Sequence, residues 1–394
     1  MSGNLRATLD SIMSQAVGGS PAIPGVVAAL TDRKGDIYEG VAGLREVGGE
    51  RMTFDTLLAI YSCTKAVTGV AALQCHEEGL IDLDAPAKRY VPEIDNLWVL
   101  EGFDVDSRHL MRPPRAEITT RMLLLHTSGL AYDFTSPLQS RWSREMGHRR
   151  QAAKAALYTP LVADPGERWC YGGGIEWVGL VVESVRRKRL ADVVRQRILA
   201  PLEMKDTAWS PSLAAWERRA GMHLRERDGA LRVAQLSRAI PEPELDLGGT
   251  GLYSTVGDYM KFIRMWLNDG LCAAGRILKP ETVAMAKRNG LYRAFPNVGV
   301  LEGSNPAFSN RVEFFPGLKK GWGLTFLINE EEAPTGRPAG SLSWAGLSNV
   351  YYWIDIASGF GGMWATQILP FGDPASFSGF EAFETAFYRA LTQP

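Results

Sequence analysis

A serine and a lysine three residues apart are the strongest chemical signal in this chain. Ser62-Cys63-Thr64-Lys65 contains its only Ser-x-x-Lys spacing. On a helix, positions i and i+3 share a face, so the Lys65 amine can reach the Ser62 hydroxyl. A serine hydroxyl becomes a useful nucleophile when a base takes its proton, and a lysine is such a base when burial or a nearby cation lowers its pKa. We therefore expect Ser62 to be a nucleophile and Lys65 its base.

The residues that follow Ser62 strengthen this hypothesis. An alanine- and valine-rich helix is predicted from Thr64 to Glu78, ended by Gly79. Ser62 then lies at its amino-terminal end, where the dipole and free N–H groups favour developing negative charge. Gly69 inside the helix predicts close packing against another element. The competing interpretation is a helix cap beside a surface lysine, because short motifs of this kind also arise by chance.

Tyr171 is the next candidate. It stands beside Gly172-Gly173-Gly174, at a turn that enters a helix predicted from Ile175 to Arg187. If its phenol faces Ser62 and Lys65, the ammonium is expected to lower its pKa from about 10 and make it a proton shuttle. The alternative is a tyrosine whose ring anchors the turn.

A segment around Trp344 is predicted to be an edge strand that lines the cleft. Acyl transfer needs two backbone donors for the oxyanion, and the N–H groups of Ser62 and Leu347 would supply them. The small pair Ala345-Gly346 is expected to leave room for substrate. Trp344 itself is interpreted either as a substrate contact or as a core aromatic residue.

The elements that must position these residues follow a pattern along the chain. β-Rich runs lie near both ends, at 25–31, 37–41, 322–328, 349–354 and 363–369, with helices at 1–19 and 376–391. Helical patterns fill the middle, at 64–78, 120–126 and 175–187. The predicted fold class is therefore α/β (α+β): an antiparallel sheet built from both chain ends and flanked by helices, residues 1–85 and 245–394, with a mostly helical lobe, residues 86–244, inserted. The expected site is the cleft between them, with loop-like stretches at 100–115 and 289–320 as candidate walls.

Composition excludes several classes of function. The chain has 394 residues, of which 45% are hydrophobic, and 43 basic residues nearly balance 44 acidic ones. No net field is present to attract nucleic acid or a membrane surface, so the expected partner is a small, weakly polar molecule. The four cysteines are too scattered for a disulfide framework or a zinc site, and no apolar run is long enough to span a membrane. Without a signal-peptide pattern, the expectation is a soluble, cytoplasmic protein.

Other nucleophile and metal chemistries are disfavoured. The five histidines show no metal-ligand spacing, and no Gly-x-Ser-x-Gly elbow is present. His126 lies in a His-Thr-Ser-Gly turn and is interpreted as a structural residue whose ring bonds backbone. Tyr132, Asp133 and Phe134 follow this turn and either line an acyl pocket or simply pack.

Taken in order, the Ser-x-x-Lys motif, Tyr171-Gly172-Gly173 and Trp344-Ala345-Gly346 resemble the three motifs of the class C β-lactamase and penicillin-recognising superfamily. Within it the likeness is greatest to family VIII carboxylesterases, and it extends to acyltransferases of the lovastatin pathway. Supporting stretches lie at 99–104, 124–130, 248–254 and 341–354. The resemblance implies a β-lactamase/transpeptidase-like fold, acylation of Ser62, proton transfer by Lys65 and Tyr171, oxyanion donors at Ser62 and Leu347, and no cofactor or metal.

Two departures from the β-lactamase motifs narrow the expected substrate. Trp344 replaces the lysine that would hold a β-lactam carboxylate, and Gly173 replaces the asparagine that would hold its side chain. The predicted function is a serine carboxylesterase, a carboxylic ester hydrolase, acting on small short-acyl esters through a Ser62 acyl-enzyme. The alternatives are an acyltransferase with an alcohol acceptor, a weak β-lactamase or amidase, and a binding protein that acylates and stalls. The physiological ester and the oligomeric state stay open, a homodimer being one option.

Overall fold

The computed structural model describes residues 3–147, 154–234, 243–291 and 295–392 of the chain. A seven-stranded sheet forms its largest layer. The strands in spatial order are β13 (Lys320–Trp322), β14 (Leu327–Asn329), β15 (Leu342–Gly346), β16 (Val350–Asp355), β17 (Phe360–Ala365), β1 (Gly25–Thr31) and β2 (Asp36–Gly43). Every neighbouring pair is antiparallel.

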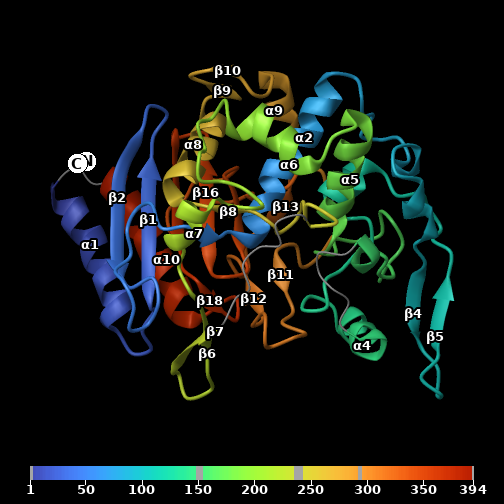
Figure 1. The fold of residues 1–394 in the computed structure, drawn as a ribbon, viewed down its shortest axis with the longest axis horizontal. Helices are drawn as coiled ribbons and strands as arrows, with labels where there is room; N and C mark the ends of the chain where they lie inside the picture. The colour runs from blue at the N-terminus through green and yellow to red at the C-terminus, as the bar shows by residue number, and fades with distance from the viewer. Residues whose placement is uncertain (1–2, 148–153, 235–242, 292–294, 393–394) are drawn as a thin grey trace.

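The sheet is assembled from both ends of the chain, as predicted. Strand β1 pairs with β17, so that Val27 lies opposite Ala365, and Figure 1 shows the first two strands beside the C-terminal ones. Every residue of β1 and of β16 is buried, because helices cover both faces of the sheet. Long-range pairing of this kind lets the first and last segments of the chain share one core.

Helices α1 (Gly3–Gly18) and α10 (Pro374–Thr392) pack together on one face of the sheet, and α8 (Val256–Leu267) lies on the other. Successive side chains of β16 point alternately to these two helical layers. Tyr351 stacks on Phe380 of α10 with ring centroids 4.8 Å apart, whereas Tyr352 lies 5.2 Å from Tyr259 of α8. The alternation is that of a strand whose successive side chains point to opposite faces.

The remaining segments form the part of the molecule at the right of Figure 1, together with short elements at the edges. The remaining α-helices of the described residues are α2 (Thr64–Glu77), α3 (Thr120–Leu124), α4 (Pro137–Met146), α5 (Gly174–Arg186), α6 (Leu190–Val194), α7 (Leu213–Glu217) and α9 (Pro280–Ala286). The short strands are β3 (Leu58–Ala59), β4 (Val99–Phe103), β5 (His109–Arg112), β6 (Met222–Arg225), β7 (Leu231–Ala234), β8 (Tyr253–Ser254), β9 (Leu271–Cys272), β10 (Gly275–Arg276), β11 (Val300–Leu301), β12 (Val312–Glu313) and β18 (Ile368–Leu369). The domain limits proposed from the sequence stay a prediction.

Two predicted segments differ from the structure. The stretch 100–115, expected to be a loop, contains most of the β4–β5 hairpin. The strand expected at 322–328 is instead two strands joined by a turn, in which the Gly323 N–H bonds the Phe326 carbonyl at 2.8 Å. Residues 292–294 of the second predicted loop lie outside the described residues.

Gly69 of α2 is confirmed as a point of close packing. A Cβ there would lie 3.0 Å from the side chain of Thr325, in the turn between β13 and β14. The absence of a side chain therefore lets the sheet edge contact the helix that follows Ser62.

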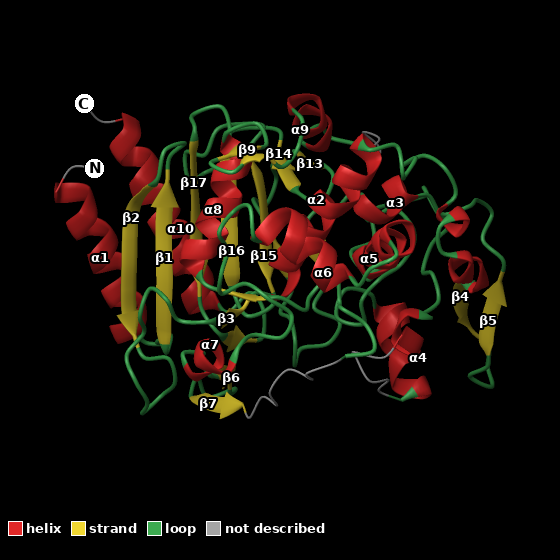
Figure 2. Ribbon diagram, turned by 45° about the horizontal axis from the view of Figure 1, so that its top comes forward, coloured by secondary structure: helices red, strands yellow, loops and turns green. Residues whose placement is uncertain are grey.

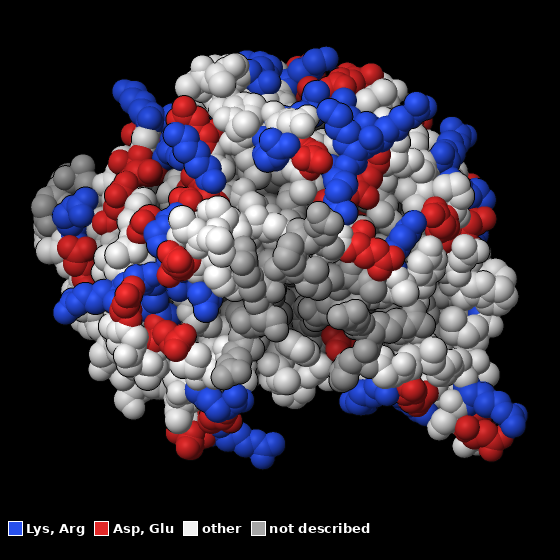
Figure 3. Space-filling model, viewed as in Figure 1, with Lys and Arg blue, Asp and Glu red and all other residues white. Residues whose placement is uncertain are grey.

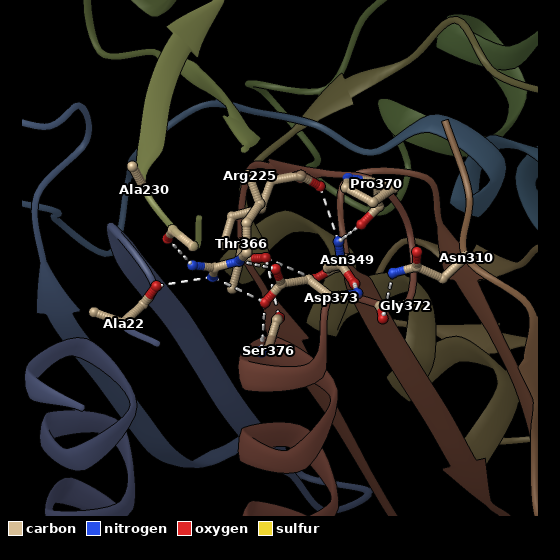
Figure 4. A network of polar contacts seen from close by, with 12 residues as sticks. Ala22, Arg225, Ala230, Asn310, Asn349, Thr366, Pro370, Gly372, Asp373 and Ser376 are labelled. Atoms are coloured by element: carbon tan, nitrogen blue, oxygen red, sulfur yellow. Dashed lines mark hydrogen bonds and ion pairs between the residues drawn. The ribbon is translucent and has the colours of Figure 1, made fainter. Parts of the chain in front are cut away.

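A buried polar network joins three distant parts of the chain (Figure 4). The Arg225 guanidinium at the end of β6 pairs with the Asp373 carboxylate and donates to the Ala22 carbonyl at 2.8 Å. The Asp373 N–H in turn donates to Asn349 Oδ1 at 2.9 Å. Since the Arg225 and Asp373 side chains are only 10% and 1% exposed, the loss of either would leave a buried charge without its partner.

The surface shows no sorting by charge on the face drawn in Figure 3, where basic and acidic side chains are interspersed. Among the described residues, no helix combines the length and apolar character needed to cross a bilayer.

Candidate active site

Ser62 lies in a tight turn between a short strand and a long helix. Strand β3 ends at Ala59, a 3₁₀ turn covers Tyr61–Cys63, and α2 begins at Thr64. Tyr61 has φ of 43°, in the left-handed region that bulky residues avoid at a cost of about 1–3 kcal/mol. This conformation turns the chain so that Ser62 directly precedes the amino-terminal end of α2, as predicted.

Lys65 is buried directly beside Ser62. Its side chain has an exposed fraction of 1%, and its Nζ lies 3.2 Å from Ser62 Oγ, 3.1 Å from the Tyr132 hydroxyl and 2.8 Å from the Gly249 carbonyl. Burial lowers the pKa of this amine from 10.5 to about 8, while the Glu176 carboxylate opposes the change. Lys65 thus has the geometry and the lowered pKa that the base of Ser62 requires.

Tyr171 reaches the same point from the turn before α5. Its phenol accepts a hydrogen bond from Trp344 Nε1 at 2.9 Å, and its interactions with Trp344 and Ser62 both act to lower its pKa. The pKa that we expected to fall is instead raised, because the cost of burying a phenolate exceeds the effect of these two interactions. Burial therefore favours Tyr171 as a neutral phenol that can relay a proton, and of the two groups Lys65 has the pKa that suits a base.

Backbone contacts hold the Tyr171 turn against the segment that carries Tyr132. The Tyr132 N–H donates to the Tyr171 carbonyl at 3.2 Å, and Thr135 Oγ1 donates to the same oxygen at 2.7 Å. A Cβ on Gly172 would lie 2.3 Å from the Leu130 carbonyl, so only glycine allows this approach. The glycines beside Tyr171 thus explain how two phenols come to face one lysine.

Trp344 belongs to an interior strand and not to an edge strand as predicted. Among the described residues, β14 pairs only with Leu342 and Ser343, so the second half of β15 is free of a partner on that side and packs on the turn that holds Ser62. The space beside Gly346 is also occupied, since a Cβ there would lie 2.3 Å from the Ile60 carbonyl. Glycine at 346 serves close approach of the strand, not room for substrate.

The two predicted oxyanion donors lie on segments that are clamped together. Leu347 follows β15 directly, and the next residue, Ser348, bonds the Ala59 carbonyl through its hydroxyl at 3.0 Å. Gln367 donates to Ser348 Oγ at 2.9 Å and to the Ala59 carbonyl at 3.1 Å, and it accepts from the Ala59 N–H at 3.0 Å. The clamp fixes the loop of Leu347 against the strand that leads to Ser62. The donor roles of both amides stay a prediction.

The residues predicted to line the substrate site are divided between two positions. Tyr132 and Phe134 are partly buried and stack with ring centroids 5.1 Å apart, while Asp133 accepts a hydrogen bond from Asn305 Nδ2 at 3.2 Å. Trp344 and Ala345 are 3% and 4% exposed and lie in the core beneath Tyr171. Tyr132 also makes a contact that the sequence did not indicate, since its hydroxyl lies 3.1 Å from Lys65 Nζ.

The His126 ring does not bond backbone as expected. Among the described residues, neither ring nitrogen has a hydrogen-bond partner, and the backbone carbonyl instead accepts the Cys170 N–H at 2.7 Å. The ring packs between Tyr171 and Trp322, with centroids 4.7 and 5.3 Å away, and burial lowers its pKa. A neutral imidazole without polar contacts is a packing group. His126 is therefore structural, as expected, but its ring packs against aromatic side chains and does not bond backbone.

Glu176 and Gln367 are the polar residues of this site that sequence reasoning missed. Glu176 lies in the first turn of α5 and is 5% exposed, with its carboxylate on the Gly249 N–H at 2.8 Å. An acidic residue between apolar neighbours on a buried helix was the available signal. Gln367 carried no such signal, because its contacts join segments that are far apart in sequence.

The arrangement as a whole suits attack on a carbonyl carbon. On one side of Ser62 lies the Lys65 amine, which can be neutral, and on the other lies the Tyr171 phenol, which can relay a proton; both groups are buried. Such a set can form and break a covalent acyl-serine without a metal ion.

Comparison with known proteins agrees with this geometry. The Beta-lactamase family model matches residues 9–384. Monacolin J acid methylbutanoyltransferase of Aspergillus terreus is 32% identical over 94% of this chain and 93% of its own length. Lovastatin esterase of Penicillium rubens is 32% identical over 88% of this chain and 90% of its own.

A solved structure agrees equally well. Unliganded simvastatin synthase of Aspergillus terreus superposes with a TM-score of 0.85 and 29% identity, covering 100% of both chains. A family match over almost the whole chain, with the fold and the order of motifs described above, leaves a single assignment. The chain belongs to the β-lactamase family, beside relatives named as an acyltransferase and as an esterase.

Proposed function

We propose that this protein is a serine acyltransferase, which takes an acyl group from a small ester onto Ser62 and passes it to an alcohol acceptor. The observation that carries the proposal is the buried contact of Ser62 with Lys65 at 3.2 Å. The names of the relatives at 30–32% identity, most of which are acyltransferases, favour transfer over the plain hydrolysis expected from the sequence.

The chemistry proceeds in two balanced steps. Ser62 Oγ attacks the carbonyl carbon and gives its proton to the Lys65 amine; the bond to the leaving alcohol then breaks, and this alcohol receives the proton from the Lys65 ammonium through Tyr171. In the second step the acceptor alcohol gives its proton to Lys65 and attacks the acyl carbon. Ser62 leaves and regains the proton. The N–H groups of Ser62 and Leu347 are the proposed donors to both oxyanions.

Tyr171 packs on a cluster of buried tryptophans. Trp169, Trp322 and Trp344 have ring centroids within 6.5 Å of Tyr171, and all three are buried. These rings keep water away from the side of Tyr171 that faces the core.

The test is a partitioning experiment. The protein is incubated with p-nitrophenyl butyrate and increasing concentrations of an alcohol, and nitrophenol, butyric acid and the new ester are measured separately. Transfer predicts that the new ester replaces butyric acid as the alcohol concentration rises. Formation of butyric acid alone at every concentration would contradict transfer.

Ester hydrolysis is the second candidate, and the identity with lovastatin esterase favours it. Both reactions share the acyl-enzyme, so Ser62→Ala must abolish both, and intact-protein mass spectrometry must detect the butyryl group on the wild type only. Full turnover by Ser62→Ala would overturn both candidates. Because Trp344 replaces the lysine of β-lactamases, nitrocefin should be turned over far more slowly than the ester.

A further inference from the structure

Glu176 is a buried acid with a defined set of partners. Its neighbours Ile175 and Trp177 are 0% and 1% exposed, and its own exposed fraction is 5%. The carboxylate accepts the Gly249 N–H at 2.8 Å, and its interaction with the Tyr132 hydroxyl acts to lower its pKa, whereas burial raises it. Burying a carboxylate is costly unless such contacts compensate for lost water.

The nearby Glu176 carboxylate favours one direction of the Tyr132 hydroxyl. A phenol has one hydrogen to donate, and an ionised carboxylate can only accept. With the Tyr132 hydrogen directed to Glu176, the phenol oxygen is left as an acceptor for Lys65 Nζ, 3.1 Å away.

Gly249 provides the second link. Its carbonyl accepts from Lys65 Nζ at 2.8 Å, while its N–H donates to Glu176. A Cβ on Gly249 would lie 2.6 Å from the Glu176 carboxylate and 3.1 Å from Lys65 Nζ, so the glycine also keeps the two groups close. The two groups that contact Lys65 besides Ser62 are the Tyr132 hydroxyl and the Gly249 carbonyl, and both residues interact with the Glu176 carboxylate.

The consequence concerns the neutral amine. A deprotonated lysine has two N–H donors and one lone pair. When the donors point to acceptors at Tyr132 and Gly249, the lone pair is left for the third neighbour, Ser62 Oγ.

We propose that Glu176 is a positioning residue, which fixes Tyr132 and the Gly249 peptide as acceptors and thereby directs the lone pair of Lys65 onto the Ser62 hydroxyl. The inference rests on the proposed acyl-enzyme function and names a group that acts through Lys65 rather than on substrate.

The charge of Glu176 gives this role a pH signature. The titratable groups that face Lys65 are Glu176 on α5, Tyr132, Tyr171 and His126 from the neighbouring turns, and Cys63 just before its own helix. Of these only Glu176 is a carboxylic acid, and its charge raises the pKa of Lys65 against the effect of burial, more than Cys63 does. Replacing it by glutamine should therefore lower the pKa of Lys65 further.

The experiment measures the rate of Ser62 acylation by p-nitrophenyl butyrate between pH 5 and pH 10 for the wild type and Glu176→Gln. We expect the rate at pH 8 to fall roughly tenfold or more, and the acidic limb to move about one unit to lower pH. The ratio of the two rates should then narrow as the pH falls. If the acidic limb of the profile stayed at the same pH, and the ratio of wild-type to variant rates did not depend on pH, the role of Glu176 would be merely structural and the inference would be overturned.

The control and a second variant keep the test decisive. Glu183→Gln alters a second acid of α5, which is only partly buried and accepts the Leu190 N–H at 2.7 Å. It should leave the pH profile of acylation unchanged. Tyr132→Phe removes one acceptor for Lys65 and should slow acylation, and combining it with Glu176→Gln should cost less than the product of the two single effects. Independent effects would refute the coupling through Tyr132. Failure of the acyl-enzyme itself is recognised separately, by turnover in Ser62→Ala.

Discussion

Replacing Trp344 by phenylalanine isolates one hydrogen bond in the active site. The indole Nε1–H donates to the Tyr171 hydroxyl at 2.9 Å, and this bond lowers the pKa of a phenol that burial otherwise raises. Phenylalanine keeps an aromatic ring against Trp322 and Phe314, whose centroids lie 4.6 and 5.6 Å from that of Trp344, but removes the donor.

The expected loss follows from the charge on the acceptor. Negative charge builds up on the Tyr171 oxygen while it relays a proton, and a hydrogen bond to a charged group is worth about 1.5–3 kcal/mol. Lost only in the transition state, this corresponds to a roughly 10- to 150-fold slower acylation. The smaller ring leaves a cavity in the core, so the free energy of unfolding should also fall by about 1–2 kcal/mol.

Trp353 on the adjacent strand offers a matched control. It is 0% exposed, its Nε1 has no hydrogen-bond partner among the described residues, and its ring packs on Phe380 of α10, away from the site. Trp353→Phe should lose comparable stability without slowing acylation. Stopped-flow release of nitrophenol measures the acylation rate, and urea unfolding measures the stability of both variants.

Two results would refute the reasoning. If Trp344→Phe acylates Ser62 at the wild-type rate, the hydrogen bond to Tyr171 does not contribute to the reaction. If Trp353→Phe is slowed to the same extent, the effect arises from packing and not from the lost donor.

Three further predictions concern the base, the strand next to Ser62 and the buried ion pair. Because Lys65 must be neutral to accept a proton and burial lowers its pKa to about 8, the acylation rate should rise with pH and level off above about 8; a rise that continues to pH 10.5 would mean that burial does not act as described. Gly346→Ala would place a Cβ 2.3 Å from the Ile60 carbonyl, so esterase assays and thermal unfolding should both show a severe loss. Arg225→Leu should lower the free energy of unfolding in urea by about 3–5 kcal/mol, because Asp373 is then buried without its partner; a change below 1 kcal/mol would contradict this.

Local patterns were sufficient for most of the elements. The helix after Ser62, the β1–β2 hairpin and the terminal helix α10 lie close to their predicted bounds, because apolar periodicity and glycine stops act within a few residues. The strand predicted at 322–328 failed because its turn depends on the approach of distant backbone, as a Cβ on Gly323 would lie 2.3 Å from the Ala286 carbonyl. Such a contact leaves no trace in local composition.

The sequence by itself brought Ser62 and Lys65 together, and their roles as nucleophile and base stay a prediction. The spacing of Ser62 and Lys65 places them on one helical turn whatever surrounds them, since helix geometry depends only on the local backbone. It also indicated Tyr171 and the strand at Trp344 through their order along the chain.

Only the tertiary structure decided how these groups behave. The pKa values of Lys65 and Tyr171 depend on burial and on distant partners. Here burial lowers the pKa of Lys65 and raises that of Tyr171, so that the neutral form of each is favoured. Glu176 and the Gln367 clamp act through contacts between segments that are remote in the chain. Desolvation and long-range hydrogen bonds exist only once the chain has folded, and for that physical reason no spacing of residue types could reveal them.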